Sequence, residues 1–376
     1  MMKLKLFTVL FIGSALLTSC GQKNEEVSTV DNNNIDSLIG LYPDSLPLLI
    51  KKSEMLIAES MYGDAMNFAA KSFRLDSTNE TARMLYAKSL NNRPERTTQD
   101  ILTARRHFQT IVNADSLNKE AFVQLGLTFT QLSEFDQAFV NINKALRIDK
   151  KFRDAYVAKG TTYRMEIVNI ESEIQSIGNE DQQKVGALAR EIKERWDLMK
   201  SSYETAVQQD PEFFEAYFEL GRIYQMEGDK ICIEYFTTAH ELKPEIKEIE
   251  YYLAFSKQHY GQGPQVENAR SMYRQMATGD EEEKTCEFTS QCVSYPSLAL
   301  FQLGHLKQFY DNDLDSAIYF YNSATKSAPD FVEAYHNMGM CYDLKGNKTQ
   351  ALKKFGQALK FDPEYTLSRE YADRIK

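Results

Sequence analysis

Three histidines, His259, His305 and His336, are the side chains whose chemistry first suggests a site in this chain. Imidazoles bind transition metals, but these three fall on three separate expected helices, and no carboxylate can be assigned to orient them. The loop at 346–349 (GNKT) lacks the glycine directly before lysine that a phosphate-binding loop requires. No HExxH or GxSxG motif occurs. We therefore expect no metal, no cofactor and no catalytic residues, and a binding protein in place of an enzyme.

These histidines stand in a repeating helical pattern whose clearest copy is residues 332–365. Two runs of small and large apolar residues at helical spacing are separated by Gly346 and ended by Pro363. The landmarks of this copy are Tyr335, Met338, Gly339, Tyr342, Ala351, Phe355 and Ala358. The pattern resembles the tetratricopeptide repeat, a helix–turn–helix unit of about 34 residues. The resemblance implies an all-α superhelical solenoid, because one such unit cannot bury its apolar faces alone.

The pattern predicts about eight units that cover nearly all of the chain. Their expected boundaries are 46–79, 80–118, 119–152, 153–213, 214–246, 247–283, 297–331 and 332–365. After the last unit, residues 366–376 carry Leu367, Tyr371 and Ile375 at intervals of four. This segment resembles the extra helix that caps many such arrays.

The unit at 153–213 is about 27 residues longer than a regular unit. Apolar residues recur at helical spacing before and after a turn at 178–181, which predicts an antiparallel helical hairpin that projects roughly 20 Å beyond the array. Its apolar stripe includes Ile170, Ile174, Leu188 and Trp196. Core packing explains these positions, and a surface for a partner on the protruding hairpin is the alternative.

The N-terminal sequence resembles a targeting signal. Lys3 and Lys5 precede an apolar run from Leu6 to Leu16, which is too short to span a membrane. The sequence LTSC at 17–20 resembles a bacterial lipoprotein signal, which implies a signal peptide at 1–19 and lipidation of Cys20. An ordinary secretory signal is the alternative. Residues 20–45 are expected to form a disordered tether, whose QKNEE segment is similar to surface-export signals of Bacteroidetes lipoproteins and equally to an acidic linker, and whose Asp-Ser-Leu triplets resemble that phylum's glycosylation motif.

Cys286 and Cys292 lie in an insert between the sixth and seventh units. Thiols outside the cytoplasm tend to pair, so this spacing is compatible with a disulfide if the loop geometry allows it. No histidine follows at ligand spacing, and a zinc site is therefore not expected.

The family resemblance implies that first helices line a groove, and in the C-terminal half this groove becomes aromatic and amide-rich. Rigid aromatic side chains with polar tips suit recognition of a peptide or a partner helix. Packing against the next unit is the alternative for each residue. The candidate partner-binding residues are Phe218, Arg222, Tyr252, Phe255, His259, Phe301, His305, His336, Asn337 and Met340.

The formal net charge of −10 argues against a nucleic-acid partner, because phosphate binding requires a basic surface. We expect a non-enzymatic, membrane-anchored scaffold that binds protein partners in the bacterial cell envelope, in an outer-membrane assembly, secretion or cell-wall complex. The resemblance places it in the outer membrane, facing the periplasm or the cell surface. The alternative is a surface lipoprotein that captures a glycan or nutrient through the aromatic groove.

Overall fold

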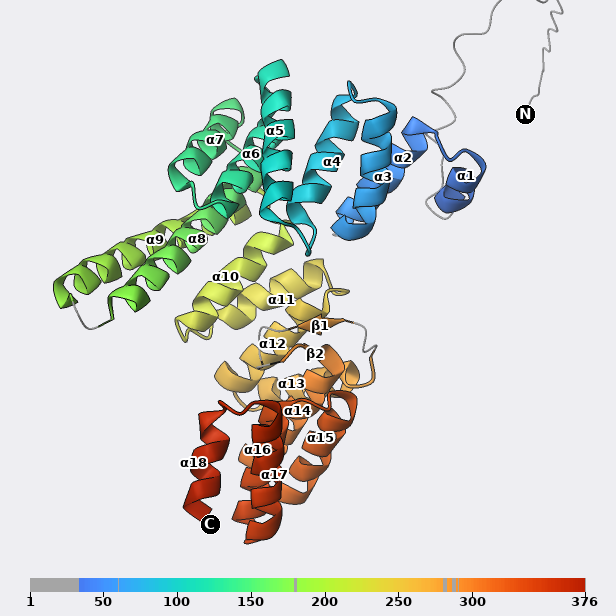
Figure 1. The fold of residues 1–376 in the computed structure, drawn as a ribbon. Coiled ribbons are helices and arrows are strands. Elements are labelled where there is room, and N and C mark those ends of the chain that lie inside the picture. The colour runs from blue at the N-terminus through green and yellow to red at the C-terminus, as the bar shows by residue number, and fades with distance from the viewer. Residues whose placement is uncertain are drawn as a thin grey trace, which may run out of the picture. The chain divides into compact units, whose positions relative to one another are not determined.

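The computed structural model describes residues 34–59, 61–178, 181–279, 283–285, 289 and 291–375. Within these ranges the chain folds into eighteen helices and one short β-hairpin (Figure 1). It divides into two compact units, which we call unit 1 (Met1–Lys150) and unit 2 (Lys151–Lys376). The predicted signal peptide and Cys20 lie outside the described residues. None of the described helices combines the length and the hydropathy of a membrane span.

Unit 1 begins with a short helix followed by three helical pairs in which consecutive helices pack antiparallel, as the repeat pattern predicts. Its helices are α1 (Ile35–Leu41), α2 (Leu46–Ala58), α3 (Tyr62–Leu75), α4 (Glu80–Asn92), α5 (Thr98–Ala114), α6 (Lys119–Gln131) and α7 (Phe135–Ile148). Helix α1 lies within residues 20–45, which the sequence predicts to be a disordered tether. It is held in place by Ile35, which packs into the interior with only 1% of its surface exposed. An ion pair of 2.9 Å between Lys52 and Asp36 also ties α1 to α2.

Unit 2 holds the elongated hairpin, four further helical pairs and the C-terminal helix. Its helices are α8 (Arg153–Ile177), α9 (Gln182–Gln209), α10 (Phe214–Met226), α11 (Cys232–Leu242), α12 (Lys247–Tyr260), α13 (Pro264–Met276), α14 (Tyr295–Phe309), α15 (Leu314–Ser327), α16 (Val332–Leu344), α17 (Lys348–Phe361) and α18 (Thr366–Ile375). The predicted all-α solenoid with one long hairpin and a capping helix is confirmed. The insert before α14 forms the antiparallel pair of β1 (Lys284–Thr285) and β2 (Val293–Ser294).

A small residue on each first helix lets the second helix of the same pair approach closely. A Cβ atom added at Gly339 would lie 2.5 Å from the ring of Phe355, and one at Gly304 would lie 2.7 Å from the ring of Tyr321. In unit 1, a Cβ at Gly126 would lie 2.7 Å from Ile142. The same packing therefore builds the pairs of both units.

The connections between pairs repeat one local design. An aspartate follows five of the eight second helices among the described residues. Several of these carboxylates accept a hydrogen bond from the backbone two residues later, as Asp115 does from Leu117 and Asp362 from Glu364, both at 2.9 Å. An asparagine then caps several helices, with Asn118 Oδ1 accepting from the backbone N–H of Ala121 at 2.9 Å. These contacts explain why the Asp-Ser-Leu triplet at 115–117 forms a turn.

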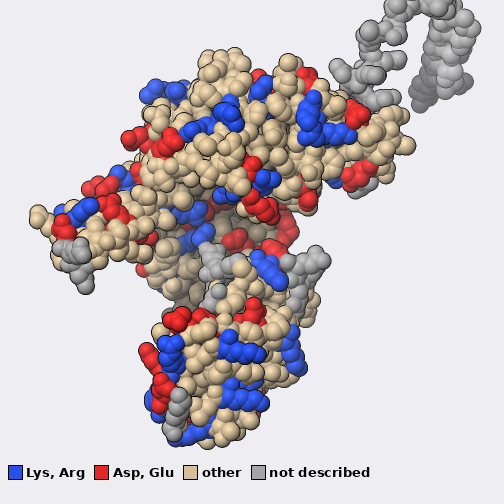
Figure 2. All heavy atoms as spheres, viewed as in Figure 1, with Lys and Arg blue, Asp and Glu red and all other residues tan. Residues whose placement is uncertain are grey.

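Charged side chains are distributed over the surface. Figure 2 shows acidic and basic residues interspersed on the face in view, with basic residues gathered over α15 to α17. Mixed charge of this kind is typical of a solvated surface.

Candidate first-helix binding surface

The first helices of unit 2 are joined by side chains near their C-terminal ends. Gln225 Nε2 of α10 donates to Ser256 Oγ of α12 at 3.0 Å, and Gln258 Nε2 of α12 donates to Gln302 Oε1 of α14 at 3.3 Å. Tyr310 adds a bond of 2.8 Å from its hydroxyl to the backbone oxygen of Gln258. These contacts hold α10, α12 and α14 side by side.

Four rings form a continuous row across α12 and α14, and we call them the ring row: Phe255, His259, His305 and Phe309. Ring centroids are 4.1 Å apart for Phe255 and His259, 6.0 Å for the two histidines, and 4.4 Å for His305 and Phe309. His259 is exposed, and 53% of the surface of Phe309 is exposed. The row therefore leaves aromatic and imidazole surface exposed.

Amide side chains behind the ring row hold it in place. Gln258 Nε2 lies 3.1 Å from Nδ1 of His305, and Gln302 Nε2 donates to the hydroxyl of Tyr251 at 2.9 Å. Burial lowers the pKa of His305 to about 4 and also lowers the pKa of His259. His305 is therefore neutral near pH 7, and the Gln258 amide donates to its Nδ1.

At the α10 end of this surface, an arginine lies beside two aromatic rings. The guanidinium of Arg222 is 5.8 Å from the ring centroid of Phe218 and 5.7 Å from that of Tyr252. Tyr252 itself is only 4% exposed and packs at 5.3 Å against Phe236 of α11. Its ring therefore belongs to the interior, whereas Phe218 and Arg222 remain partly exposed.

One predicted binding residue of α16, His336, is covered by α18. His336 is 5% exposed, its Nδ1 lies 3.0 Å from Ser368 Oγ of α18, and its ring meets Tyr371 edge-on at 5.3 Å. Burial lowers the pKa of His336 to about 4. His336 thus packs beneath the capping helix, and the expectation that it faces a partner is not supported.

The remaining predicted residues of this set are also partly engaged in packing. Asn337 Nδ2 donates to the hydroxyl of Tyr321 at 3.3 Å, and Met340 packs against the cluster around Phe355. Phe301 lies between Tyr321 and Phe331, at ring distances of 5.5 and 5.0 Å. All three stay half-buried, so their binding role remains a prediction.

The long hairpin is built by an apolar seam and three ion pairs. Ile170 is buried, while Ile174, Leu188 and Trp196 are half-buried, with Trp196 packed against the cluster that contains Met199. Arg195 pairs with Glu166 at 2.9 Å and with Glu191 at 3.0 Å, and Lys184 pairs with Glu173 at 2.8 Å. The described side chains of the stripe serve packing, and a role in partner binding stays a prediction.

Cys292 is engaged in a disulfide, whereas Cys232 and Cys341 are free and buried. The expected partner, Cys286, lies outside the described residues, so this pairing stays a prediction. No group of three or more potential metal ligands occurs among the residues that the structure describes.

Sequence reasoning missed one feature of this surface. In four repeats of unit 2, the thirteenth residue is exposed near the end of the first helix. The counts start at Phe214, Lys247, Ser297 and Val332. These residues are Met226, His259, Phe309 and Leu344, and the three apolar members are 71%, 53% and 66% exposed in that order. Alignment of the repeats would have found them, because exposed apolar residues at one repeat position are unusual on a solvated helix.

Comparison with known proteins agrees with this architecture. Residues 332–365 match the family described as Tetratricopeptide repeat. The fold is similar to a chain of the APC/C hetero-tetramer Cut9-Hcn1, with a TM-score of 0.54 and 16% identity over 91% of this chain and 58% of that chain. It is also similar to human IFIT1, solved as a dimer with m7Gppp-AAAA, with a TM-score of 0.51 and 14% identity over 87% of this chain and 66% of that chain.

The chain spans less than two thirds of either solved chain, and at these identities the likeness concerns the fold alone. No curated protein matches the sequence. The repeat at 332–365 and the helical pairs that precede it lead to one conclusion. The chain has the fold of a tetratricopeptide-repeat solenoid and carries a recognisable member of that repeat family in its last helical pair.

Proposed function

We propose that this protein is a non-enzymatic scaffold that binds a protein partner through the first-helix surface of unit 2. The observation that carries the proposal is the ring row, in which the exposed His259 of α12 and the exposed Phe309 of α14 both contact the half-buried ring of His305. Large aromatic surface held rigidly by buried hydrogen bonds is the kind of surface that dominates binding energy at protein interfaces. The repeat fold itself is consistent with a scaffold.

The charge of the chain favours a protein over a nucleic acid as the partner. One of the two similar folds is solved as a protein assembly and the other with a capped RNA, so the fold alone decides nothing here. A formal net charge of −10 opposes binding of a phosphate backbone. Neutral His305 adds no positive charge to the ring row.

We further propose that the scaffold acts in the bacterial cell envelope, anchored in the outer membrane by lipid on Cys20. The support is the sequence signal at 17–20 alone. Labelling of cells with radioactive palmitate should mark the wild-type chain and not the Cys20→Ala variant. Equal labelling of both would remove the anchor from the proposal.

Crosslinking in intact cells, followed by affinity capture and mass spectrometry, tests the binding function. The wild-type chain should recover a defined protein partner, and the double variant His259→Ala/Phe309→Ala should lose it. Tyr319→Ala is the matched control, because Tyr319 is equally prominent, 66% exposed, but lies on the second helix α15. If the control loses the partner as fully as the double variant, the ring row is not the binding surface. If sugar arrays bind and no protein is recovered, the glycan-capture alternative replaces the scaffold.

A further inference from the structure

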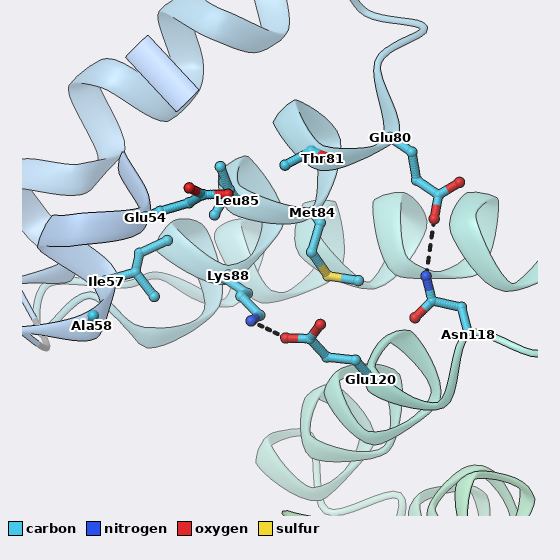
Figure 3. Close-up of a pocket in the computed structure, with 10 residues that line it drawn as sticks. All are labelled: Glu54, Ile57, Ala58, Glu80, Thr81, Met84, Leu85, Lys88, Asn118 and Glu120. Atoms are coloured by element: carbon cyan, nitrogen blue, oxygen red, sulfur yellow. Dashed lines mark hydrogen bonds and ion pairs between the residues drawn. The ribbon is translucent and has the colours of Figure 1, made fainter. Parts of the chain in front are cut away.

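The first helices of unit 1 border an open pocket of ≈ 400 Å³ between α2, α4 and the start of α6 (Figure 3). Its floor is apolar, formed by Met84 and Leu85, which are almost fully buried, and by the half-buried Ile57. The close-up shows Met84 between the carboxylates of Glu54, Glu80 and Glu120. An apolar floor with a charged rim fits a ligand that has an aliphatic stem and a charged end.

The rim carries an excess of negative charge. Lys88 pairs with Glu120, and Asn118 Nδ2 donates to Glu80 Oε1 at 2.9 Å. Glu54 forms no hydrogen bond or ion pair with the residues that the structure describes. Three carboxylates against one ammonium group leave two negative charges uncompensated within the lining. A cation that enters the pocket would therefore gain attraction from carboxylates on more than one helix.

The chain's own Lys88 shows what kind of group the pocket accepts. Its side chain is only 19% exposed, so its methylene stem lies along the lining while its ammonium group meets Glu120. The pocket volume lies at the small end of ligand sites, which run from roughly 300 to 1,000 Å³. It has room for one further long side chain together with its flanking backbone.

We propose that this pocket binds the side chain of a lysine or arginine carried on an extended segment of a protein partner. The stem of the guest packs on Met84 and Leu85, and its charged end meets Glu54 and Glu120. Lys88 competes for the same carboxylates, so it weakens the binding of the guest. This inference goes beyond the proposed function, since it concerns unit 1 and a cationic guest, and it does not depend on the ring row.

The test uses the full chain with labelled methionine methyl groups, observed by NMR, with the Met84 signal assigned from a Met84→Leu variant. The probes are the peptide acetyl-GSLKLSG-amide and its counterpart with norleucine in place of lysine. We expect the lysine peptide to shift the Met84 signal with an affinity about tenfold higher than the norleucine peptide, and this preference should decline as salt increases.

Three variants give effects of different sign. Glu54→Gln/Glu120→Gln should abolish the preference for lysine, and Lys88→Met should strengthen binding of the lysine peptide severalfold. Glu95→Gln, on the exposed turn before α5, is the matched control and should change nothing. All these residues lie at the surface or half-exposed, and circular dichroism checks that each variant folds. Equal affinity for both peptides, no shift of Met84, or an unchanged preference in the double variant would each overturn the proposal.

Discussion

The first-helix surfaces of the two units share a backbone design but differ in chemistry. In unit 2 the surface is a row of rings supported by amides, and the two histidines of the ring row are neutral near pH 7. In unit 1 it is an apolar pocket with three carboxylates on its rim. Both surfaces rest on the same contact between a small residue of the first helix and a large residue of the second. The difference shows that the repeat constrains the packing positions and leaves the chemistry of the remaining first-helix positions free to vary.

The largest expected difference between the two units is in how much acid lowers their stability. Four of the five histidines lie in unit 2, and burial lowers the pKa of each, to about 4 for His305 and His336. In the unfolded chain a histidine has a pKa near 6.5, so the unfolded state takes up protons first as the pH falls. The histidines should therefore contribute their full stabilisation to unit 2 above pH 6.5. By pH 5 the free energy of unfolding of unit 2 should fall by about 2–4 kcal/mol, after allowance for the partial exposure of His305.

Amide hydrogen exchange of the two units at pH 7.5 and pH 5, corrected for the intrinsic exchange rate, measures this difference. Unit 1 should respond less, because its single histidine, His107, has a pKa that burial also lowers. Glu215 and Glu250 of unit 2 act in the opposite direction, since burial raises the pKa of each. The His336→Gln variant isolates the histidine effect and should be less sensitive to acid than the wild type. Equal sensitivity would contradict this explanation.

Adding a methyl group at the close contact between the first and second helices should destabilise both units. Gly339→Ala in unit 2 brings a methyl group to 2.5 Å from the rigid ring of Phe355, and we expect a loss of about 2–3 kcal/mol in the free energy of unfolding. Gly126→Ala in unit 1 meets Cγ1 of the buried Ile142 at 2.7 Å and the backbone oxygen of Ala138 at 3.1 Å, and should cost about 1–2 kcal/mol. Urea unfolding measures both. A neutral Gly339→Ala would show that the contact is not essential to the repeat.

The ring row should be more important for binding than for stability. Phe309→Ala removes a ring that is 53% exposed, so we expect a change of under about 1 kcal/mol in the free energy of unfolding. Removal of an aromatic contact from an interface commonly costs about 1–2 kcal/mol, which corresponds to roughly a tenfold weaker Kd for the captured partner. Urea unfolding and a binding titration with that partner compare the two effects. A large loss of stability with unchanged affinity would place Phe309 in the core instead.

The smallest effect is expected at a glycine outside the shared contact. Gly356 lies within α17, and a Cβ added there meets no atom within 4 Å. Gly356→Ala should raise the free energy of unfolding by about 0.5–1 kcal/mol, because alanine restricts the unfolded chain and favours a helix. This variant is the control for Gly339→Ala, and destabilisation by both would indicate that alanine is harmful for reasons other than crowding.

Much of the fold follows from sequence spacing. The lengths of α8 and α9, 25 and 28 residues against 13 and 14 in the pair before them, agree with the insertion inferred from the apolar stripe. The candidate surface was only partly predictable. The sequence predicts His259 and His305, which do lie together. It does not predict Phe309 or the carboxylates around Met84, because their proximity depends on contacts between neighbouring repeats.

The sequence by itself determined the helical pairs, the close contacts at glycine and the capping helix, because these depend on residue spacing within one repeat and on turn residues next to it. The tertiary structure decided which first-helix residues are exposed. A helical period assigns His305 and His336 to equivalent faces, yet His305 belongs to the partly exposed ring row while α18 covers His336. The reason is that exposure depends on which neighbouring helix packs against that face, and this is a property of the assembled array.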